Sequence, residues 1–200
     1  MFYTTRFRIS ILTIVLVCTA KVRAQPRTFE LDPAQTKIAF TLGTVLHTVH
    51  GSFNLKRGSI RFDDSTGEAS GELVVDALSG ESGNSSRDKK MHKENLESSM
   101  YSDIAFTPKH IKGTVARDGK SQVTVDGLLA LHGQSHPMIL TIDLWLQHGA
   151  GSVDTAFVVP YETWGVKNPS TFILRVSDKV EINVHAFGRL TPATATPSAH

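Results

Sequence analysis

Alternation of apolar and polar side chains runs through most of this chain and restricts it to folds built from half-buried strands. In the run 121–131 most apolar side chains (Val123, Val125, Leu129 and Leu131) fall on odd positions, and in 137–147 most of them (Met138, Leu140, Ile142, Leu144 and Leu146) fall on even positions. Neighbouring side chains of a strand point to opposite faces, so a period of two gives each run one apolar face. Shorter examples of the same alternation occur at Ile38, Phe40, Leu42, Val49, Gly51, Phe53, Ile60, Phe62 and through 179–189.

Glycine-containing turn sequences separate these runs. They read DDSTGE around Gly67, RDGK around Gly119, LHGQSHP around Gly133 and HGAGS around Gly149. Strands that follow one another at about 8–15 residues, with no helix between most of them, favour an antiparallel meander. Eight or nine strands with one apolar face each predict a closed barrel or a sandwich.

One segment departs from the strand pattern, and we expect it to form a helix at about 86–97. It reads SSRDKKMHKENLESSM, which is rich in helix formers, and Ser86 is the expected N-cap. Met91, Leu96 and Met100 recur at near-helical spacing, so one side of the helix can rest on a sheet or plug the mouth of a barrel. The preceding SGESGNS is expected to be a flexible lead-in.

The first 24 residues have the features of a secretory signal peptide. Two arginines precede the uncharged run 9–20, which is too short to span about 30 Å of hydrocarbon. A small residue, Ala24, stands before an expected cut at Gln25, and a retained anchor helix is the alternative. We expect a periplasmic or secreted protein with a barrel domain at 28–190 and a disordered Pro/Thr/Ala-rich tail at 191–200.

Removal of residues 1–24 changes the charge and the cysteine content of the chain. Of 21 Lys and Arg residues, four lie in this segment, which leaves 17 basic against 19 acidic side chains, a formal charge of −2. A domain without a basic excess lacks the electrostatic footprint of a nucleic-acid-binding protein. Cys18 is the only cysteine, so cleavage excludes disulfides and thiolate chemistry, whereas lipidation of Cys18 would retain it.

The histidines raise the hypothesis of a metal site, which the spacing does not favour. His47 and His50 are three apart, and on a strand that spacing points them to opposite faces. His132 and His136 flank a turn and would have to converge across it. Neither pair has a cluster of carboxylates beside it, so we expect no metal.

An enzyme is the second hypothesis. The chain has no GxSxG nucleophile elbow, and the candidate acid–base pair is Glu72 with Asp76, which share the face of one strand. A polar residue of the predicted helix, such as His92, is another candidate at a barrel mouth. Basic residues of the same helix are interpreted as its solvated face, with attraction to lipid phosphates or an anionic membrane as the alternative. They are Arg87, Lys89, Lys90 and Lys93.

Four segments in order give the chain a resemblance to the YceI-like family of exported lipid- and polyisoprenoid-binding proteins. They are VHGSFNLKRGSIRFD (49–63), SSRDKKMHKENLESSMYSDIAF (85–106), LLALHGQSHPMILTI (128–142), and ETWGVKNPS with VSDKVEINVHAFG, which resemble the closing strands of a subgroup. The similarity covers about 28–190. Two departures concern the mouth and so the ligand: Ser102 follows Tyr101 where family members often have proline, and the loop SGESGN is small and glycine-rich.

The resemblance implies an all-β fold, an extended antiparallel eight-stranded lipocalin-like barrel with its one helix near one end. It implies a non-enzymatic binder or carrier of a long isoprenoid-like lipid in an apolar tunnel, with no cofactor and no catalytic residues, and transient membrane contact is compatible with that role. A hydrolase or isomerase at the mouth and a plain structural barrel remain the alternatives. The expected lining residues are Phe40, Leu42, Phe53, Phe62, Phe106, Val125, Leu129, Leu140, Ile142, Leu144, Phe157, Ile182 and Val184, with Met91 and Leu96 at the mouth.

Overall fold

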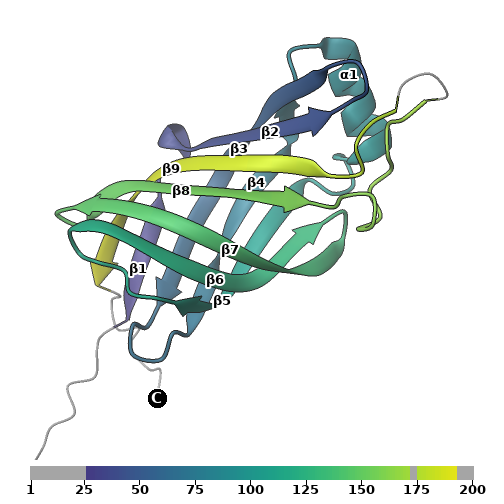
Figure 1. Cartoon of the computed structure of the whole chain (residues 1–200). Helices are drawn as coiled ribbons and strands as arrows, with labels where there is room; N and C mark the ends of the chain where they lie inside the picture. Colours follow the sequence, from purple (N-terminus) through teal and green to yellow (C-terminus); the bar gives the residue numbers. More distant parts are fainter. Residues whose placement is uncertain (1–25, 172–174, 193–200) are drawn as a thin grey trace, which may run out of the picture.

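The computed structural model describes residues 26–171 and 175–192, which form nine antiparallel strands and one short helical segment (Figure 1). The strands are β1 (Arg27–Leu31), β2 (Lys37–Gly43), β3 (Thr48–Phe62), β4 (Ala69–Glu81), β5 (Asp103–Lys112), β6 (Gly119–Leu131), β7 (Gln134–Gln147), β8 (Ala150–Val159) and β9 (Val180–Pro192). The helical elements are the 3-10 turn η1 (Pro33–Gln35), the helix α1 (Ser85–Lys90) and the π-helical turn η2 (Met91–Asn95) that continues it. The predicted all-β class and the single helix are confirmed.

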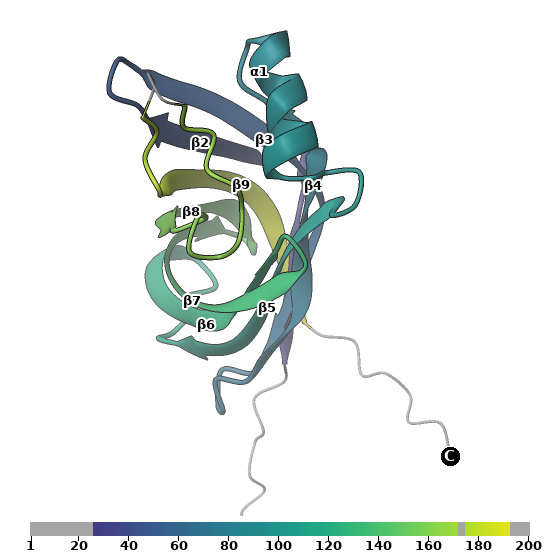
Figure 2. The same ribbon diagram turned by 90° about the vertical axis from the view of Figure 1, so that its right-hand side faces the viewer.

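The sheet closes into a barrel of eight positions, because β1 and β2 share one of them. Both strands pair with β3 on one side and with β9 on the other, β1 towards one end and β2 towards the other. The 3-10 turn η1 breaks the strand between them, and Asp32 caps that turn by accepting a hydrogen bond from the Ala34 amide at 2.9 Å. The remaining strands pair in chain order from β3 to β9. Seen along its axis, the sheet wraps round into a ring (Figure 2).

Two-residue turns with a common sequence connect β6 to β7 and β7 to β8. Each consists of His-Gly, at 132–133 and 148–149, and all four residues have positive φ angles between 51° and 77°. Positive φ at both central residues defines the type I′ turn, whose twist matches that of the flanking strands. These turns set the register in which Val125 lies opposite Leu140.

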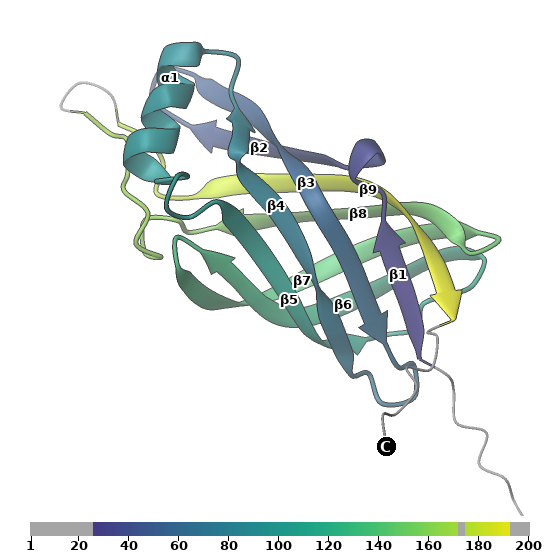
Figure 3. The same cartoon turned by 180° about the vertical axis from the view of Figure 1, so that it is seen from behind.

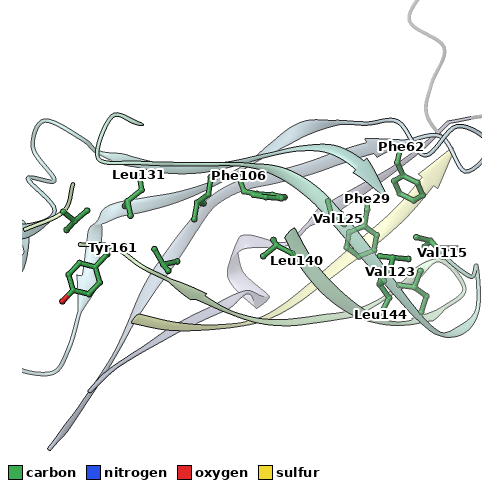
Figure 4. Close-up of a cluster of buried hydrophobic side chains, with 14 residues drawn as sticks. Phe29, Phe62, Phe106, Val115, Val123, Val125, Leu131, Leu140, Leu144 and Tyr161 are labelled. Carbon is green, nitrogen blue, oxygen red and sulfur yellow. The ribbon is translucent and has the colours of Figure 1, made fainter. Parts of the chain in front are cut away.

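The predicted inner faces are confirmed for the long strands. On β6 the odd positions from 123 to 131 are buried, and on β7 Leu140, Leu144 and Leu146 are buried, whereas Thr141 and Asp143 are not. The buried side chains form one apolar cluster along the inside of the barrel (Figure 4). Each strand therefore has one face towards the interior and one towards solvent, as its period of two requires.

The helical segment begins earlier than predicted and has a different N-cap. Asn84, not Ser86, accepts hydrogen bonds from the amides of Ser86 and Arg87, at 3.1 and 3.0 Å. The predicted flexible lead-in is also wrong in part, because β4 continues to Glu81. Met100, expected on the packed side, lies beyond the helical turns and is 71% exposed.

The ends of the domain differ slightly from the predicted boundaries. β9 runs through Thr191 and Pro192, which the sequence assigned to the tail, because both residues pair with β1. The predicted signal peptide, the lipidation alternative at Cys18 and the rest of the tail (193–200) lie outside the described residues. Within the described part of the chain, no helix has the length and apolar character needed to cross a membrane.

Candidate ligand cavity

A cavity of about 680 Å³ occupies the inside of the barrel, and most of its lining is aliphatic or aromatic. Its volume falls in the range of about 300–1,000 Å³ that is common for small-molecule sites. The structure brings all fifteen predicted lining and mouth residues to this one cavity. They are Phe40, Leu42, Phe53, Phe62, Met91, Leu96, Phe106, Val125, Leu129, Leu140, Ile142, Leu144, Phe157, Ile182 and Val184.

Phenylalanine rings leave the bore open because several of them lie against glycines of the wall. Phe40 is opposite Gly51, and a Cβ on that glycine would stand 2.3 Å from the ring. A Cβ on Gly80 would stand 2.5 Å from the ring of Phe53. Any side chain at either glycine would push the ring away from the sheet and into the space that the cavity occupies.

One end of the barrel is crossed by a buried arginine. Arg27 on β1 is 8% exposed and donates to the Val115 carbonyl at 2.8 Å, and its guanidinium also pairs with the Asp64 carboxylate. The guanidinium lies 5.0 Å from the centre of the Phe62 ring. The side chain thus joins β1 to the segments that follow β3 and β5, and it holds this end together.

The helical segment and the covering loop (residues 160–171 and 175–179) lie at the other end of the barrel (Figure 3). Residues of both line the cavity. Tyr161 anchors the loop, since its hydroxyl donates to the Ser177 carbonyl. Burial, reinforced by the charges of Glu162 and Asp178, raises the pKa of Tyr161 to about 12, so the phenol stays neutral and keeps donating at physiological pH.

Two further contacts fix this loop over the mouth. The Asn95 side-chain amide, which is buried at the end of η2, donates to the Lys167 carbonyl at 2.7 Å. Trp164 stacks on the His136 ring of β7, with the ring centres 4.2 Å apart and the planes nearly parallel. The loop is therefore attached to the helical segment on one side and to the β6–β7 hairpin on the other.

The segment ETWGVKNPS is part of this loop, which corrects its assignment to a closing strand. Residues 162–170 contain no strand. Lining residues that the sequence pattern did not reveal include Phe29, Tyr161, Val166 and Lys167. Without strand periodicity, the sequence does not show which side chains of this loop face the barrel. The aromatic and apolar residues between Pro160 and Pro169 are its only signal that the loop packs against the cavity.

His92, the polar candidate for catalysis, is held by structural hydrogen bonds. One ring nitrogen, Nε2, lies 2.8 Å from the Gly80 carbonyl, and Nδ1 lies 3.0 Å from the Ser98 hydroxyl. The ring is not part of the cavity lining. Both nitrogens tie the helical turn to its surroundings, which explains a histidine at this position without any reaction.

The carboxylates proposed as an acid–base pair also lie away from the cavity lining. Glu72 accepts from Arg57 at 2.8 Å, and Asp76 forms an ion pair with Lys56 at 3.4 Å. Neither belongs to the cavity. These two contacts account for both carboxylates as ion pairs on the strands.

The histidine pairs do not form joint sites. His132 pairs with Glu97 at 2.7 Å, whereas His136 stacks on the loop, so the two rings serve different contacts. His50 lies 3.2 Å from the Thr41 hydroxyl, and His47 lines the cavity by itself. Among residues 26–171 and 175–192, no three His, Cys, Asp or Glu side chains are grouped as metal ligands would be.

All four basic helical residues are exposed, as the interpretation of a solvated face expects, but only two of them are remote from the cavity. Lys89 and Lys93 lie off the cavity, but Arg87 and Lys90 line its mouth. Lys167 approaches the same mouth from the covering loop. In the part of the chain that the structure describes, every lining side chain that carries a full charge at neutral pH is therefore cationic.

Comparisons with known proteins agree with this architecture. Residues 29–187 match the family model described as the YceI-like domain. The solved structure of BcnA from Burkholderia cenocepacia has a TM-score of 0.64 at 16% identity, covering 78% of this chain and 98% of that one. A polyisoprenoid binding domain from Saccharophagus degradans, implicated in plant cell wall breakdown, has a TM-score of 0.62 at 18% identity and covers 82% of this chain and 98% of that one.

A third solved structure, the Campylobacter jejuni YCEI protein, has a TM-score of 0.54 at 14% identity, with 94% of this chain and 92% of that one covered. At these identities the likeness concerns the fold. A search of curated proteins finds no sequence relative.

Proposed function

Because this chain belongs to the YceI-like family, whose barrel fold suggests lipid binding, we propose that it is an exported, non-enzymatic carrier of a long isoprenoid-like amphiphile. The observation that carries the proposal is the apolar cavity, which extends from Val115 at one end of the barrel to Met91 and Tyr161 at the other. Figure 4 shows apolar side chains of this lining distributed along the barrel, from Val115 near one end to Tyr161 near the other. An elongated apolar interior suits a flexible hydrocarbon tail better than a compact polar substrate.

The energetics favour a carrier over a permanent store. Burial of about 20 methylene-equivalents is worth about 16 kcal/mol gross, at about 0.8 kcal/mol each. Ordering of the tail removes much of that sum. A lipid in a bilayer is already buried, so its transfer from membrane to barrel has a net free energy near zero, and loading and unloading are both accessible.

Native mass spectrometry of the purified mature protein tests lipid binding, with uptake of a fluorescent polyprenyl analogue from liposomes as the second measurement. We expect a co-purifying lipid mass and saturable uptake. Two adjacent substitutions on β7 give a matched comparison. Leu140→Trp fills the bore and should abolish uptake, whereas Ile139→Trp lies on the outer face, where Ile139 is 66% exposed, and should bind normally. An apo mass from several hosts, together with no uptake, would refute the proposal.

Export is tested separately by N-terminal sequencing of the protein from the extracytoplasmic fraction. The expected first residue is Gln25, since Ala24 precedes the cut. A protein that retains Cys18 with a lipid adduct would replace a free carrier by a membrane-anchored one.

A further inference from the structure

The charged side chains on the cavity lining all have the same sign. They are Arg87 and Lys90 on α1 and Lys167 on the covering loop, and among the described residues no Asp or Glu lines the cavity. The protein as a whole shows no such bias, because the chain without its first 24 residues has more acidic than basic side chains. The mouth therefore has a local positive charge that the composition does not predict.

Resting on the proposed function, we propose that the cavity selects amphiphiles with an anionic oxygen head group, a phosphate or a carboxylate, which the Arg87, Lys90 and Lys167 side chains hold at the mouth. The tail lies in the barrel below them. The helical segment contributes both to the cationic mouth and to the apolar cavity below it. One side of this segment, from its first to its last turn, lines the cavity. That side consists of Ser86, Arg87, Lys90, Met91, Asn95 and Leu96.

Polarity changes along that side in the order an amphiphile requires. The helix starts beyond the end of β4 and runs back towards the start of β5 (Figure 3). Its first turns bring Ser86, Arg87 and Lys90, whereas Met91 and Leu96 follow on the part that approaches the barrel. A head group among the cations thus leaves its tail against the apolar part.

Two of the cationic residues are positioned by contacts that do not use up their charge. Arg87 donates from Nε to the Ser82 hydroxyl at 2.7 Å and from Nη2 to the Ser82 carbonyl at 2.8 Å, which orients the guanidinium and leaves further donors free. The Asp88 carboxylate accepts from the amide of the same serine at 2.9 Å. The backbone of Lys167 is held by Asn95, so its ammonium extends from a fixed point.

The two lysines lack a compensating carboxylate. Neither Lys90 nor Lys167 has an ion pair with any residue of the described chain, whereas Lys56 and Lys112 on the barrel wall do. Cations grouped at the edge of an apolar cavity raise the local potential and attract anions. Hydrogen bonds from these cations to phosphate or carboxylate are charge-assisted, and Arg adds a planar pair of donors. A neutral head makes weaker bonds there, and a cationic head is repelled.

Four ligands with one C20 isoprenoid tail test the proposal: geranylgeranyl phosphate, geranylgeranoic acid, geranylgeraniol and geranylgeranylamine. Each competes with a fluorescent polyprenyl alcohol for the mature protein, in buffer without detergent at low and at high salt. We expect the phosphate and the acid to bind more tightly than the alcohol, and the amine most weakly. High salt should reduce the differences, because the contacts are partly exposed.

The variant Lys90→Gln with Lys167→Gln should weaken phosphate binding about fourfold, at about twofold for each exposed pair, and leave the alcohol unchanged. Reversal of both charges, Lys90→Glu with Lys167→Glu, should transfer the preference to the amine. Lys89→Gln with Lys93→Gln removes the same charge from the same helix outside the cavity and should change nothing.

Equal affinity of the wild-type protein for phosphate and alcohol would overturn the head-group proposal and leave the carrier function intact. An equal loss in the Lys89/Lys93 control would also overturn it, because the effect would then be general electrostatic attraction. Failure of all four ligands to bind would instead refute the proposed function. A preference for phosphate over the acid, or the reverse, identifies which anionic head the site accepts.

Discussion

Replacement of Gly80 by alanine should narrow the mouth of the cavity with little loss of stability. Gly80 lies near the end of β4, beneath the helical segment. A Cβ built there would be 2.5 Å from Cε1 of Phe53 and 2.9 Å from the terminal methyl of Met91, and both side chains line the cavity. Carbon atoms in contact stand about 3.5–4.0 Å apart, so the ring must move by about 1 Å.

The loss of stability in Gly80→Ala depends on which atoms the added Cβ displaces. Overpacking of a core costs about 1–3 kcal/mol. The low end applies to Gly80, since the obstacles are the ends of two side chains that can move into the cavity. An unfolding free energy lower by about 1 kcal/mol corresponds to a melting temperature about 2–4 °C lower for a protein of this size. The displaced ring and methyl group then obstruct the route of the tail.

Gly127→Ala is the matched control at a similar distance from a phenylalanine. Its Cβ would be 2.6 Å from Cζ of Phe106 and also 2.6 Å from the main-chain oxygen of Thr107, which cannot move aside without shifting β5. We therefore expect the unfolding free energy of this variant to be about 3 kcal/mol lower than that of the wild type, which is the high end of the range.

Thermal unfolding followed by circular dichroism gives the stability of each variant, and transfer of a fluorescent polyprenyl analogue from liposomes gives the exchange rate. Gly80→Ala should slow transfer several-fold while it remains folded at the assay temperature. If Gly80→Ala lowers the melting temperature as much as Gly127→Ala and transfer stays at the wild-type rate, the inference that these two side chains form the mouth is refuted.

Three other perturbations test the barrel, its cover and its anchoring tyrosine. Ile142→Lys should lower the unfolding free energy, measured in urea, by several kcal/mol, because its ammonium would face the cavity. Thr141→Lys on the outer face should change the unfolding free energy by no more than about 0.5 kcal/mol. The opposite ranking would mean that the assignment of inner and outer faces on β7 is wrong. Met91→Ala with Leu96→Ala should change the rate of lipid exchange with liposomes more than the equilibrium affinity, because loss of packing at the mouth alters passage in both directions; an unchanged rate would contradict a gating role. Burial raises the pKa of Tyr161 to about 12, so the stability from its neutral phenol is complete below pH 10 and is lost as the pH rises towards 12. Chemical denaturation at pH 9 and at pH 11 should therefore show a loss of stability in the wild-type protein that Tyr161→Phe lacks. Equal losses in the two proteins would exclude this tyrosine as the cause.

The inner and outer faces of the strands follow from the sequence, because strand geometry is local. The side chain at 140 and the one at 142 point the same way in any strand, whatever that strand pairs with. The His-Gly turns are local too, since a two-residue connection with positive φ angles fixes the register of the strands on both sides. For this reason the alternation of apolar residues is sufficient to assign the lining residues of β6 and β7.

Only the tertiary structure decided how the barrel closes and what covers its mouth. The sharing of one barrel position by β1 and β2 depends on pairing between residues more than 150 apart, such as Phe29 with Leu190, and no sequence period marks such a pair. The meeting of Lys90 and Lys167 at one mouth is another long-range property, because it is set by Asn95 contacting a loop 72 residues away. Periodicity predicts which face of each element is buried. The positive charge of the mouth comes from side chains of separate elements, and only the folded chain brings these side chains together.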